Sequence, residues 1–294
     1  TVMNLTTIFY HVDEFCKLFE KEFETKVLSS GKNIRNRQSS LKLSEVMTIV
    51  IYYQQSGYKT FKDYYTRSGE LKSAFPGLTS YNRFVELQQK ITMPLAIFTK
   101  LYAVGKCDGN SYIDSFSLSV SHQKRIPSHK TFKGLAARGK TSVGWFYGFK
   151  VHVIINGWGE IIDFCITSGN VVDNNAKVIE KITEKIHGKV YGDKGYLLNP
   201  ELFQKLYSRG IHIVTKIRNN MKNKLMDIGD KIMLKKRGVI ESVGAILKED
   251  LNIEHSRYRS PRSLIVNVFS ALAAYGFRKK KPSIYKKSFC LLTA

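Results

Sequence analysis

The stretch from Ser111 to Val120 constrains the fold most, because its apolar and polar side chains alternate with a period of two. The alternation predicts a β-strand on which Tyr112, Asp114 and Phe116 share one face. A carboxylate therefore lies on the apolar face of a strand that we expect to be central. Burying an unpaired carboxylate is costly, so such an Asp normally has cations or hydrogen-bond donors beside it. Two interpretations stay open from this stretch alone: a functional Asp114, or a strand-end Asp satisfied by the local backbone.

The chain carries a large excess of positive charge. Its 294 residues include 47 Lys and Arg against 24 Asp and Glu, which gives a formal net charge of +23. A polyanion would neutralise this self-repulsion, so nucleic acid is the leading partner. An anionic membrane surface is the rival partner, but no segment resembles an anchor, and we expect no membrane association. The longest apolar run, residues 264–275, is too short to cross a bilayer. The four cysteines are widely spaced, which argues against a zinc ribbon or disulfide framework and fits a reducing cytoplasm.

The hydrophobic pattern changes near residues 105–110 and divides the chain. Residues 1–104 have the spacing of amphipathic helices, which we place at 5–23, 45–55, 60–75 and 81–93. Ser44 and Ser80 are the predicted N-caps of the second and fourth helices. The fourth helix presents polar and basic side chains, and two interpretations are open. This helical N-terminal domain is either a helix-turn-helix DNA reader or a bundle that only packs against the rest of the chain.

Residues 105–278 are predicted to form a mixed α/β domain. Two strands at 149–156 and 160–167, joined by a tight turn, can run antiparallel to the strand that carries Asp114. Further elements follow in the order strand 189–192, helix 199–210, strand 211–216, loop 221–231, helix 238–248 and helix 263–277. We expect residues 279–294 to form a basic C-terminal tail that would add to the affinity for nucleic acid.

Residues 134–141 match the phosphate-binding loop pattern G-x-x-x-x-G-K-T letter for letter. A true loop of this kind follows a buried strand and opens a helix whose N-terminus holds phosphate. Neither neighbour fits: residues 126–133 are mostly polar, and residues 142–148 are rich in glycine and aromatic side chains. We therefore set the nucleotide-binding interpretation aside in favour of a different role for this stretch.

The same region lacks negative charge, since no acidic residue occurs between Asp114 and Glu160. Basic residues accumulate there, with aromatic side chains between them. The predicted phosphate-contacting residues are Lys124, Arg125, Lys133, Arg138 and Lys140, in a run that also includes Lys130 and Lys150. Such interleaving is typical of surfaces that bind nucleic acid.

Two further acids have informative positions. Asp193 directly follows the predicted strand 189–192, and ligands bind at strand ends of α/β sheets; a turn-forming Asp is the alternative. Glu241 lies on the predicted helix 238–248, where Arg237 comes four positions before it and Lys248 seven after it. This spacing places the three side chains on one helix face. A salt-bridged helix residue is the alternative for Glu241.

Together these segments resemble the DDE transposases of bacterial insertion sequences. The resemblance rests on Y-I-D-S around Asp114, Y-G-D-K-G-Y around Asp193, and R-x3-E-x6-K at Arg237, Glu241 and Lys248. It extends through F-K-G-L-A-A-R-G-K-T-S-V-G-W-F-Y-G-F-K, I-E-H-S-R-Y-R-S and K-K-P-S, and it is close to the insertion sequence 982 family from about residue 4 to residue 284. The chain departs from related families in one respect: Leu234 stands where they have a Tyr three residues before the Arg, which puts any role of that Tyr in holding DNA in doubt.

The resemblance implies a ribonuclease-H-like fold in which Asp114, Asp193 and Glu241 are catalytic residues and metal ligands. Converging carboxylates need cations to stay ionised, and oxygen ligands suit two Mg²⁺ or Mn²⁺ ions. Arg237 and Lys248 would contact DNA phosphates. Asp173 and His255 are candidates for supporting the site; a turn-capping Asp and a packing or backbone-capping His are the alternatives.

The function implied by the resemblance is metal-dependent DNA hydrolysis and strand transfer at the ends of an insertion sequence. The expected partners are double-stranded DNA, as terminal repeats and target, and a second copy of the chain or more in the active complex. The expected location is the bacterial cytoplasm, in association with the nucleoid. A decayed transposase that binds DNA without catalysis is the alternative.

Overall fold

The computed structural model describes residues 3–29, 39–142, 144–216, 225–254 and 258–285. The chain forms two compact units, one of residues 1–103 with 247–279 and one of residues 104–246 with 280–294. The boundary after residue 103 lies close to the predicted change of pattern. At the other end the units differ from the predicted domain limits, because residues 247–278 group with the N-terminal helices. The functional division into domains stays a prediction.

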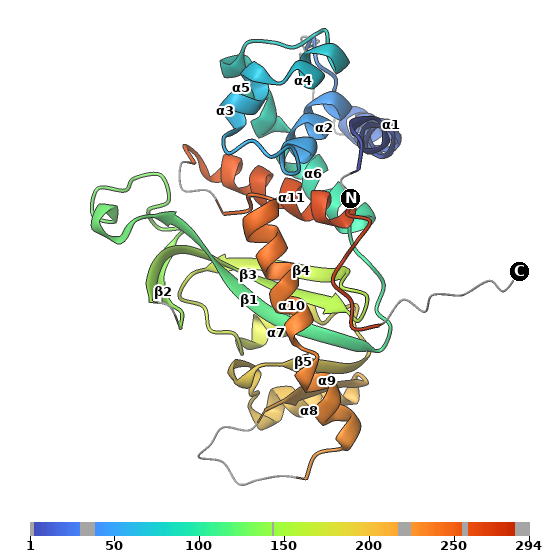
Figure 1. Ribbon diagram of the computed structural model, residues 1–294, viewed down its shortest axis with the longest axis vertical. Helices are drawn as coiled ribbons and strands as arrows, with labels where there is room; N and C mark the ends of the chain where they lie inside the picture. The colour runs from blue at the N-terminus through green and yellow to red at the C-terminus, as the bar shows by residue number, and fades with distance from the viewer. Residues whose placement is uncertain (1–2, 30–38, 143, 217–224, 255–257, 286–294) are drawn as a thin grey trace, which may run out of the picture. The chain divides into compact units, whose positions relative to one another are not determined.

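The first unit is helical in its described part (Figure 1). Its helices are α1 (Leu5–Ser29), α2 (Leu43–Tyr53), α3 (Phe61–Arg67), α4 (Gly69–Ala74), α5 (Tyr81–Lys90), α6 (Thr92–Tyr102) and α11 (Pro261–Gly276). The long apolar helix α11 packs against α2, α5 and α6. A buried polar contact fixes one crossing, since Gln54 Nε2 donates to Ser270 Oγ at 2.7 Å.

Local caps explain where these helices differ from the predicted ones. Lys42, rather than Ser44, precedes α2, and its backbone N–H donates to the Glu45 carboxylate at 2.7 Å. The predicted helix 60–75 is broken at Ser68, whose Oγ accepts from Leu71 N at 3.2 Å and starts α4. Pro94 lies in the first turn of α6 and does not end a helix, because Pro is tolerated where backbone N–H groups have no intrahelical partner.

The second unit contains a mixed α/β sheet. Its elements are β1 (Asn110–Ser121), β2 (Ala137–Lys140), β3 (Trp145–Asn156), β4 (Ile161–Ser168), α7 (Ala176–Ile182), β5 (Gly188–Gly192), α8 (Pro200–Ser208), β6 (Ile211–Thr215), α9 (Ile228–Lys235) and α10 (Gly238–Ala245). The strand order is β2-β3-β1-β5-β6, with β4 also paired to β3. β1 runs antiparallel to β3 and parallel to β5. The prediction of a mixed sheet with three antiparallel strands is confirmed.

Among the strands and α-helices given above, β2, α7 and α9 were not predicted from the sequence. Helix α9 occupies residues 228–235, so the predicted loop 221–231 is wrong for its last residues, while 221–224 lie outside the described residues. Strand β2 is followed by strand β3, which begins at Trp145. Because a phosphate-binding loop must open a helix at this point, the strand confirms that the G-x-x-x-x-G-K-T match is coincidental.

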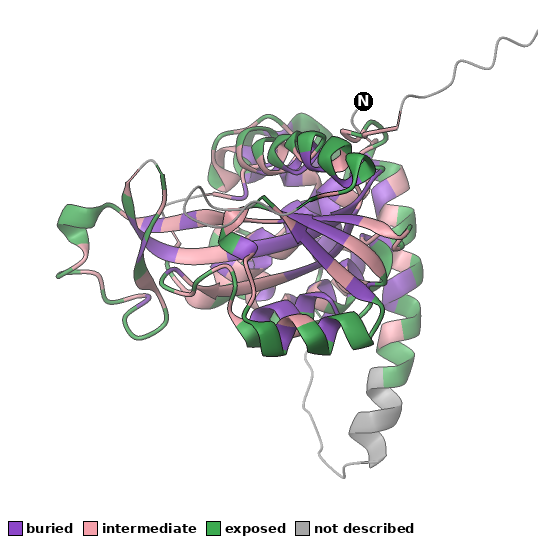
Figure 2. Ribbon diagram, turned by 90° about the horizontal axis from the view of Figure 1, so that it is seen from below, coloured by how far each residue is buried: buried purple, intermediate pink, exposed green. Residues whose placement is uncertain are grey.

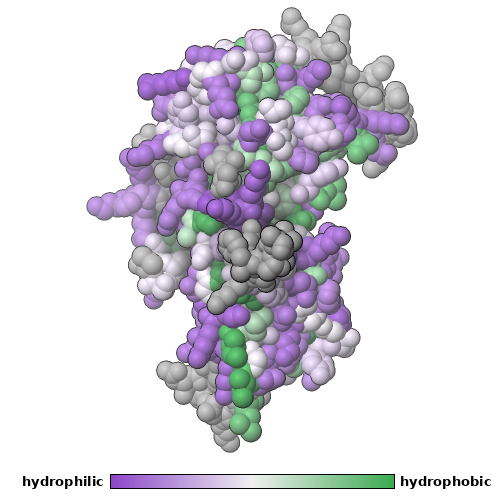
Figure 3. Space-filling model, turned by 45° about the vertical axis from the view of Figure 1, so that its right-hand side comes forward, coloured by the Kyte–Doolittle hydropathy of each residue, from purple (hydrophilic) through white to green (hydrophobic). Residues whose placement is uncertain are grey.

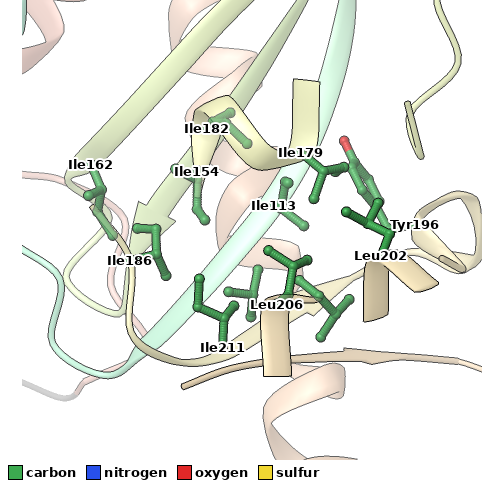
Figure 4. Packing of buried hydrophobic residues seen from close by; sticks show 12 residues of the cluster. Ile113, Ile154, Ile162, Ile179, Ile182, Ile186, Tyr196, Leu202, Leu206 and Ile211 are labelled. Carbon is green, nitrogen blue, oxygen red and sulfur yellow. The ribbon is translucent and has the colours of Figure 1, made fainter. Parts of the chain in front are cut away.

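The two faces of β1 have different neighbours. Ile113 joins a buried cluster that includes Ile154 of β3, Ile179 of α7 and Leu206 of α8 (Figure 4). Buried positions run along the central strands, and the outer sides of the flanking helices are exposed (Figure 2). The opposite face of β1 carries Asp114 and packs against α10. The alternation read from residues 111–120 therefore separates a helix-covered core from the face that carries the carboxylate.

The visible surface is mostly hydrophilic, with smaller apolar areas between the polar side chains (Figure 3). No helix in the described part of the chain has both the length and the apolar character needed to cross a bilayer. Two tryptophans are strongly exposed: Trp145 at 59% and Trp158 at 50%. Trp145 is the first residue of β3, and Trp158 lies in the turn after it.

Replacing Gly148 with Ala should destabilise the sheet. A Cβ at Gly148 would lie 1.9 Å from the carbonyl oxygen of Leu118 on the neighbouring strand, so the backbone must shift. We expect the free energy of unfolding to fall by about 3 kcal/mol, measured by urea unfolding. Gly238→Ala is the matched control, because a Cβ there meets no atom within 4 Å. Equal stability of the two variants would contradict the close strand approach.

Candidate active site

Asp114 is held at the centre of the site by a backbone donor and a cation. Its Oδ1 accepts a hydrogen bond from Ser115 N at 2.8 Å, and its Oδ2 lies 3.3 Å from Nη1 of Arg237. Burial raises the pKa of Asp114, and the charges of Asp173 and Asp193 raise it further, while Ser115 N–H and Arg237 lower it. The hydrogen bond from the local backbone, which belongs to the strand-end alternative, is present, and the positively charged Arg237 side chain is present as well.

Arg237 connects Asp114 to Glu241. Arg237 is the N-cap residue of α10, and Glu241 lies one helical turn after it. Nη2 of Arg237 lies 2.8 Å from Glu241 Oε1. The Arg237 side chain is only 18% exposed, whereas that of Glu241 is 61% exposed. One largely buried guanidinium thus pairs with two carboxylates, on β1 and α10, and leaves a net charge of −1 among the three groups. The helix-face relation predicted for Arg237 and Glu241 is confirmed, and the alternative given for Glu241, a salt-bridged helix residue, is present as this ion pair.

Asp193 reaches the same region from the end of β5. It is exposed, directly follows Gly192, and its carbonyl accepts from Tyr196 N at 2.9 Å in the short 3-10 turn Lys194–Tyr196. Its charge acts on Asp114, whose pKa it raises. A Cβ at Gly192 would lie 3.1 Å from Ile113 Cγ2, so glycine lets this strand end approach β1 closely.

Asp173 is more than a turn residue. Its Oδ1 accepts from Ser115 Oγ at 2.6 Å and from Lys150 Nζ at 3.1 Å, so it contacts the residue next to Asp114. Asn174 Nδ2 donates to Leu197 O at 3.0 Å and ties this loop to the segment after Asp193. The Lys150 side chain is 12% exposed and pairs with Asp173, so it does not share the exposed surface of its basic neighbours in sequence.

His152 lies in this region and was missed by the sequence analysis. It sits on β3 opposite Ser115, is fully buried, and its Nε2 lies 3.0 Å from Thr167 Oγ1. Burial lowers the pKa of His152 to about 4, so the imidazole is neutral at pH 7. The available signal was a polar residue at an interior position of the predicted strand 149–156.

The buried His152 should make stability depend on pH. Its pKa is about 4 in the folded protein and near the ordinary 6.5 in the unfolded chain, so unfolding takes up a proton below pH 6.5. The contribution of neutral His152 to the free energy of unfolding is fully present above about pH 6.5. It is lost as the pH falls towards 4, and the loss is on the order of 3 kcal/mol. Urea unfolding between pH 4.5 and 7 should show a smaller pH slope for His152→Gln. An unchanged slope would contradict this assignment.

The remaining predicted residues fall into three groups. The side chains of the basic stretch are all exposed, namely Lys124, Arg125, Lys133, Arg138 and Lys140. Lys248 belongs to the helical unit, in the turn of π-helix Ile246–Asp250, where its Nζ lies 3.4 Å from Glu254 Oε2. His255 lies outside the described residues, so its predicted role stays a prediction.

The carboxylates offer only oxygen donors, which is the ligand chemistry that Mg²⁺ and Mn²⁺ prefer. The charges of Asp173 and Asp193 raise the pKa of Asp114, so a cation near Asp114 would relieve their mutual repulsion. In the part of the chain that the structure describes, no group of three His, Cys, Asp or Glu side chains is arranged to hold a metal ion. Arg237 occupies oxygens of both Asp114 and Glu241. The donor chemistry therefore fits a divalent metal, while the guanidinium competes for the same oxygens.

The fold and site define a mixed α/β protein with an acid-rich centre on its middle strand. A family model described as a transposase DDE domain matches residues 104–261, which is more than half of the chain. The chain belongs to this family of DDE transposases. None of the curated proteins compared with the chain matches it.

Proposed function

We propose that the protein is a DNA transposase that cleaves phosphodiester bonds at the ends of its insertion sequence and transfers the strands to target DNA. The observation that carries the proposal is that Arg237 pairs with both Asp114 and Glu241, while the charge of Asp193 acts on Asp114, in a chain of the DDE transposase family. The strand order supports a ribonuclease-H-like fold, and the sequence motifs support membership of the insertion sequence 982 family.

The residues have distinct roles in the proposed reaction. Asp114, Asp193 and Glu241 would hold two Mg²⁺ or Mn²⁺ ions, which activate a water or 3′-hydroxyl and stabilise the leaving oxygen. Ser115 N–H fixes the orientation of Asp114. Arg237 pairs with the Asp114 and Glu241 carboxylates, and its guanidinium could contact a phosphate beside the scissile bond if metal ions took its place on these oxygens.

The proposed DNA contacts extend beyond the acids. The exposed basic residues between 124 and 140 supply phosphate contacts, and helices α3 to α5 supply a second DNA-binding region. Strand transfer involves two element ends, so the active complex contains at least two copies of the chain. The proposed location is the bacterial cytoplasm, on the nucleoid.

The test is to incubate the protein with DNA carrying candidate element ends and Mg²⁺, and to map the nicks at nucleotide resolution. Nicks at a fixed position relative to the terminal repeats, absent when the metal is chelated, support the proposal. Binding without any metal-dependent nick favours the second candidate, a decayed transposase. DNA affinity should also fall steeply with salt, because phosphate contacts release counterions.

A further inference from the structure

We propose that Trp145, at the tip of the β2–β3 hairpin, is a stacking platform for an unpaired nucleobase of the bound DNA. The proposal deepens the proposed function by naming the part of the DNA that this surface takes. The proposal depends on the proposed function in one respect, namely that the ligand is DNA. The site is distinct from the acid-rich centre on β1.

Trp145 offers an aromatic surface beside a cation. The residue is 59% exposed, and Lys140 Nζ lies 5.7 Å from the centroid of its ring. Lys140 and Trp145 form the last pair of the β2–β3 ladder, so both side chains lie on the same face of the hairpin. An exposed ring next to a Lys gives a nucleotide two contacts, one for the base and one for its phosphate.

The hairpin holds Trp145 in place. Thr141 N donates to Gly144 O at 2.8 Å and closes the tip, and Gln123 Nε2 donates to Trp145 O at 2.5 Å from the neighbouring segment. On the other face, a Cβ at Gly139 would lie 2.5 Å from the ring of Phe146, so this ring packs directly on the glycine backbone. Because the backbone of Trp145 is fixed, only the freedom of its side chain is lost when a base stacks on the ring.

The surroundings favour DNA over a protein partner. No acidic residue occurs from residue 115 to residue 159, and Arg138, Lys140 and Lys124 are exposed near the hairpin in sequence and structure. This positive charge complements a polyanion and opposes a second copy of the same basic chain. A base paired within a duplex hides its faces in the stack, so the ring would take a base that is unpaired or flipped out.

The separation along β3 between Trp145 and the acids gives an expected position for that base. Asp114 pairs with Val153 on β3, eight residues along the strand from Trp145. At about 3.3 Å per residue the separation along β3 is roughly 26 Å. For a DNA strand that runs along β3 and advances about 3.4 Å per nucleotide, the stacked base would lie roughly seven or eight nucleotides from the bond that the acids attack.

Intrinsic fluorescence tests the stacking directly, because the sequence has two tryptophans. Trp158 packs on Tyr285 with 4.6 Å between ring centroids, so Trp158→Phe keeps an aromatic ring there and leaves Trp145 as the only tryptophan. We expect oligothymidylate to quench this variant, and an abasic oligomer of equal length and charge to quench it much less. Trp145→Phe, which keeps only Trp158, should show no quenching by either oligomer.

Affinity gives the second measurement, without metal. Trp145→Ala should bind oligothymidylate about tenfold more weakly, with an unchanged affinity for the abasic oligomer. Lys140→Ala should weaken both oligomers alike and reduce the salt dependence. Because Trp145 is exposed, circular dichroism should show both variants folded. In element-end DNA, abasic scanning should weaken binding most at one position, roughly seven or eight nucleotides from the nick.

Equal quenching by both oligomers, or an unchanged affinity of Trp145→Ala, would overturn the proposal and leave a phosphate-contacting surface. Fluorescence of the Trp158→Phe variant that changes with protein concentration in the absence of DNA would show that a second copy covers Trp145, and would overturn it as well. The fluorescence and affinity measurements do not depend on DNA cleavage. A protein that binds bases at Trp145 but never nicks DNA would therefore contradict the proposed catalysis and leave the platform intact.

Discussion

Replacing Asp114 with Asn should reduce Mg²⁺-dependent cleavage of element-end DNA by at least about a thousandfold, with little effect on DNA affinity. Asn has nearly the same shape as Asp, and its side-chain oxygen can still accept from Ser115 N–H. The substitution removes the negative charge that would bind the metal and that pairs with Arg237. Because the exposed basic residues are unchanged, the phosphate contacts should persist.

The measurement combines nicking of end-labelled DNA in Mg²⁺ with fluorescence anisotropy of the same DNA in chelator. Asp108→Asn is the matched control, since Asp108 precedes β1 in the same unit and its carboxylate accepts from Tyr285 OH at 3.2 Å, away from the acids. The control should cleave like the unchanged protein. Cleavage that survives Asp114→Asn would show that the site assignment is wrong, whereas a parallel loss of binding would point to misfolding.

The main acids of the candidate site were predicted from their local positions together with the resemblance to DDE transposases, because each position alone left an alternative open. Asp114 interrupts the apolar face of an alternating strand, Asp193 ends a short strand between glycines, and Glu241 follows Arg237 by one helical turn. The role of each acid stays a prediction, but its position depends on neighbours within a few residues, so one sequence suffices to place it on its strand, strand end or helix. The same holds for the mixed sheet, whose antiparallel and parallel parts follow from short turns and helical connections.

The supporting contacts could not be predicted, because they join residues from separate elements. Ser115, Lys150 and Asp173 meet only when β1, β3 and the loop after β4 are assembled. Read locally, Lys150 is one more cation of a basic run and Asp173 is a turn residue. Tertiary packing also decides the partner of α11: its apolar sequence predicts burial, but not that it packs with helices from the start of the chain.

Breaking the ion pair between Asp173 and Lys150 should affect both DNA cleavage and the stability of the fold. Asp173→Asn should lower the cleavage rate by about 10- to 100-fold, the range typical of residues that orient a metal ligand. The change removes the negative charge of the carboxylate that accepts a hydrogen bond from Ser115 Oγ. It also leaves Lys150, whose side chain is 12% exposed, without its ion-pair partner. The unpaired, largely buried ammonium should also lower the free energy of unfolding by about 1–3 kcal/mol.

The double variant Lys150→Gln with Asp173→Asn distinguishes two roles of Asp173: orienting the segment of Ser115 and Asp114, and neutralising the charge of Lys150. Removing both charges leaves no unpaired ion, so the double variant should regain most of the stability that either single variant loses. It should not regain cleavage, because the negatively charged acceptor of Ser115 Oγ next to Asp114 is still missing. Urea unfolding and the nicking assay on all four proteins measure the two effects separately. If the double variant recovers cleavage as well, Asp173 serves only to neutralise Lys150; if the stability losses simply add, the two side chains do not act as a pair.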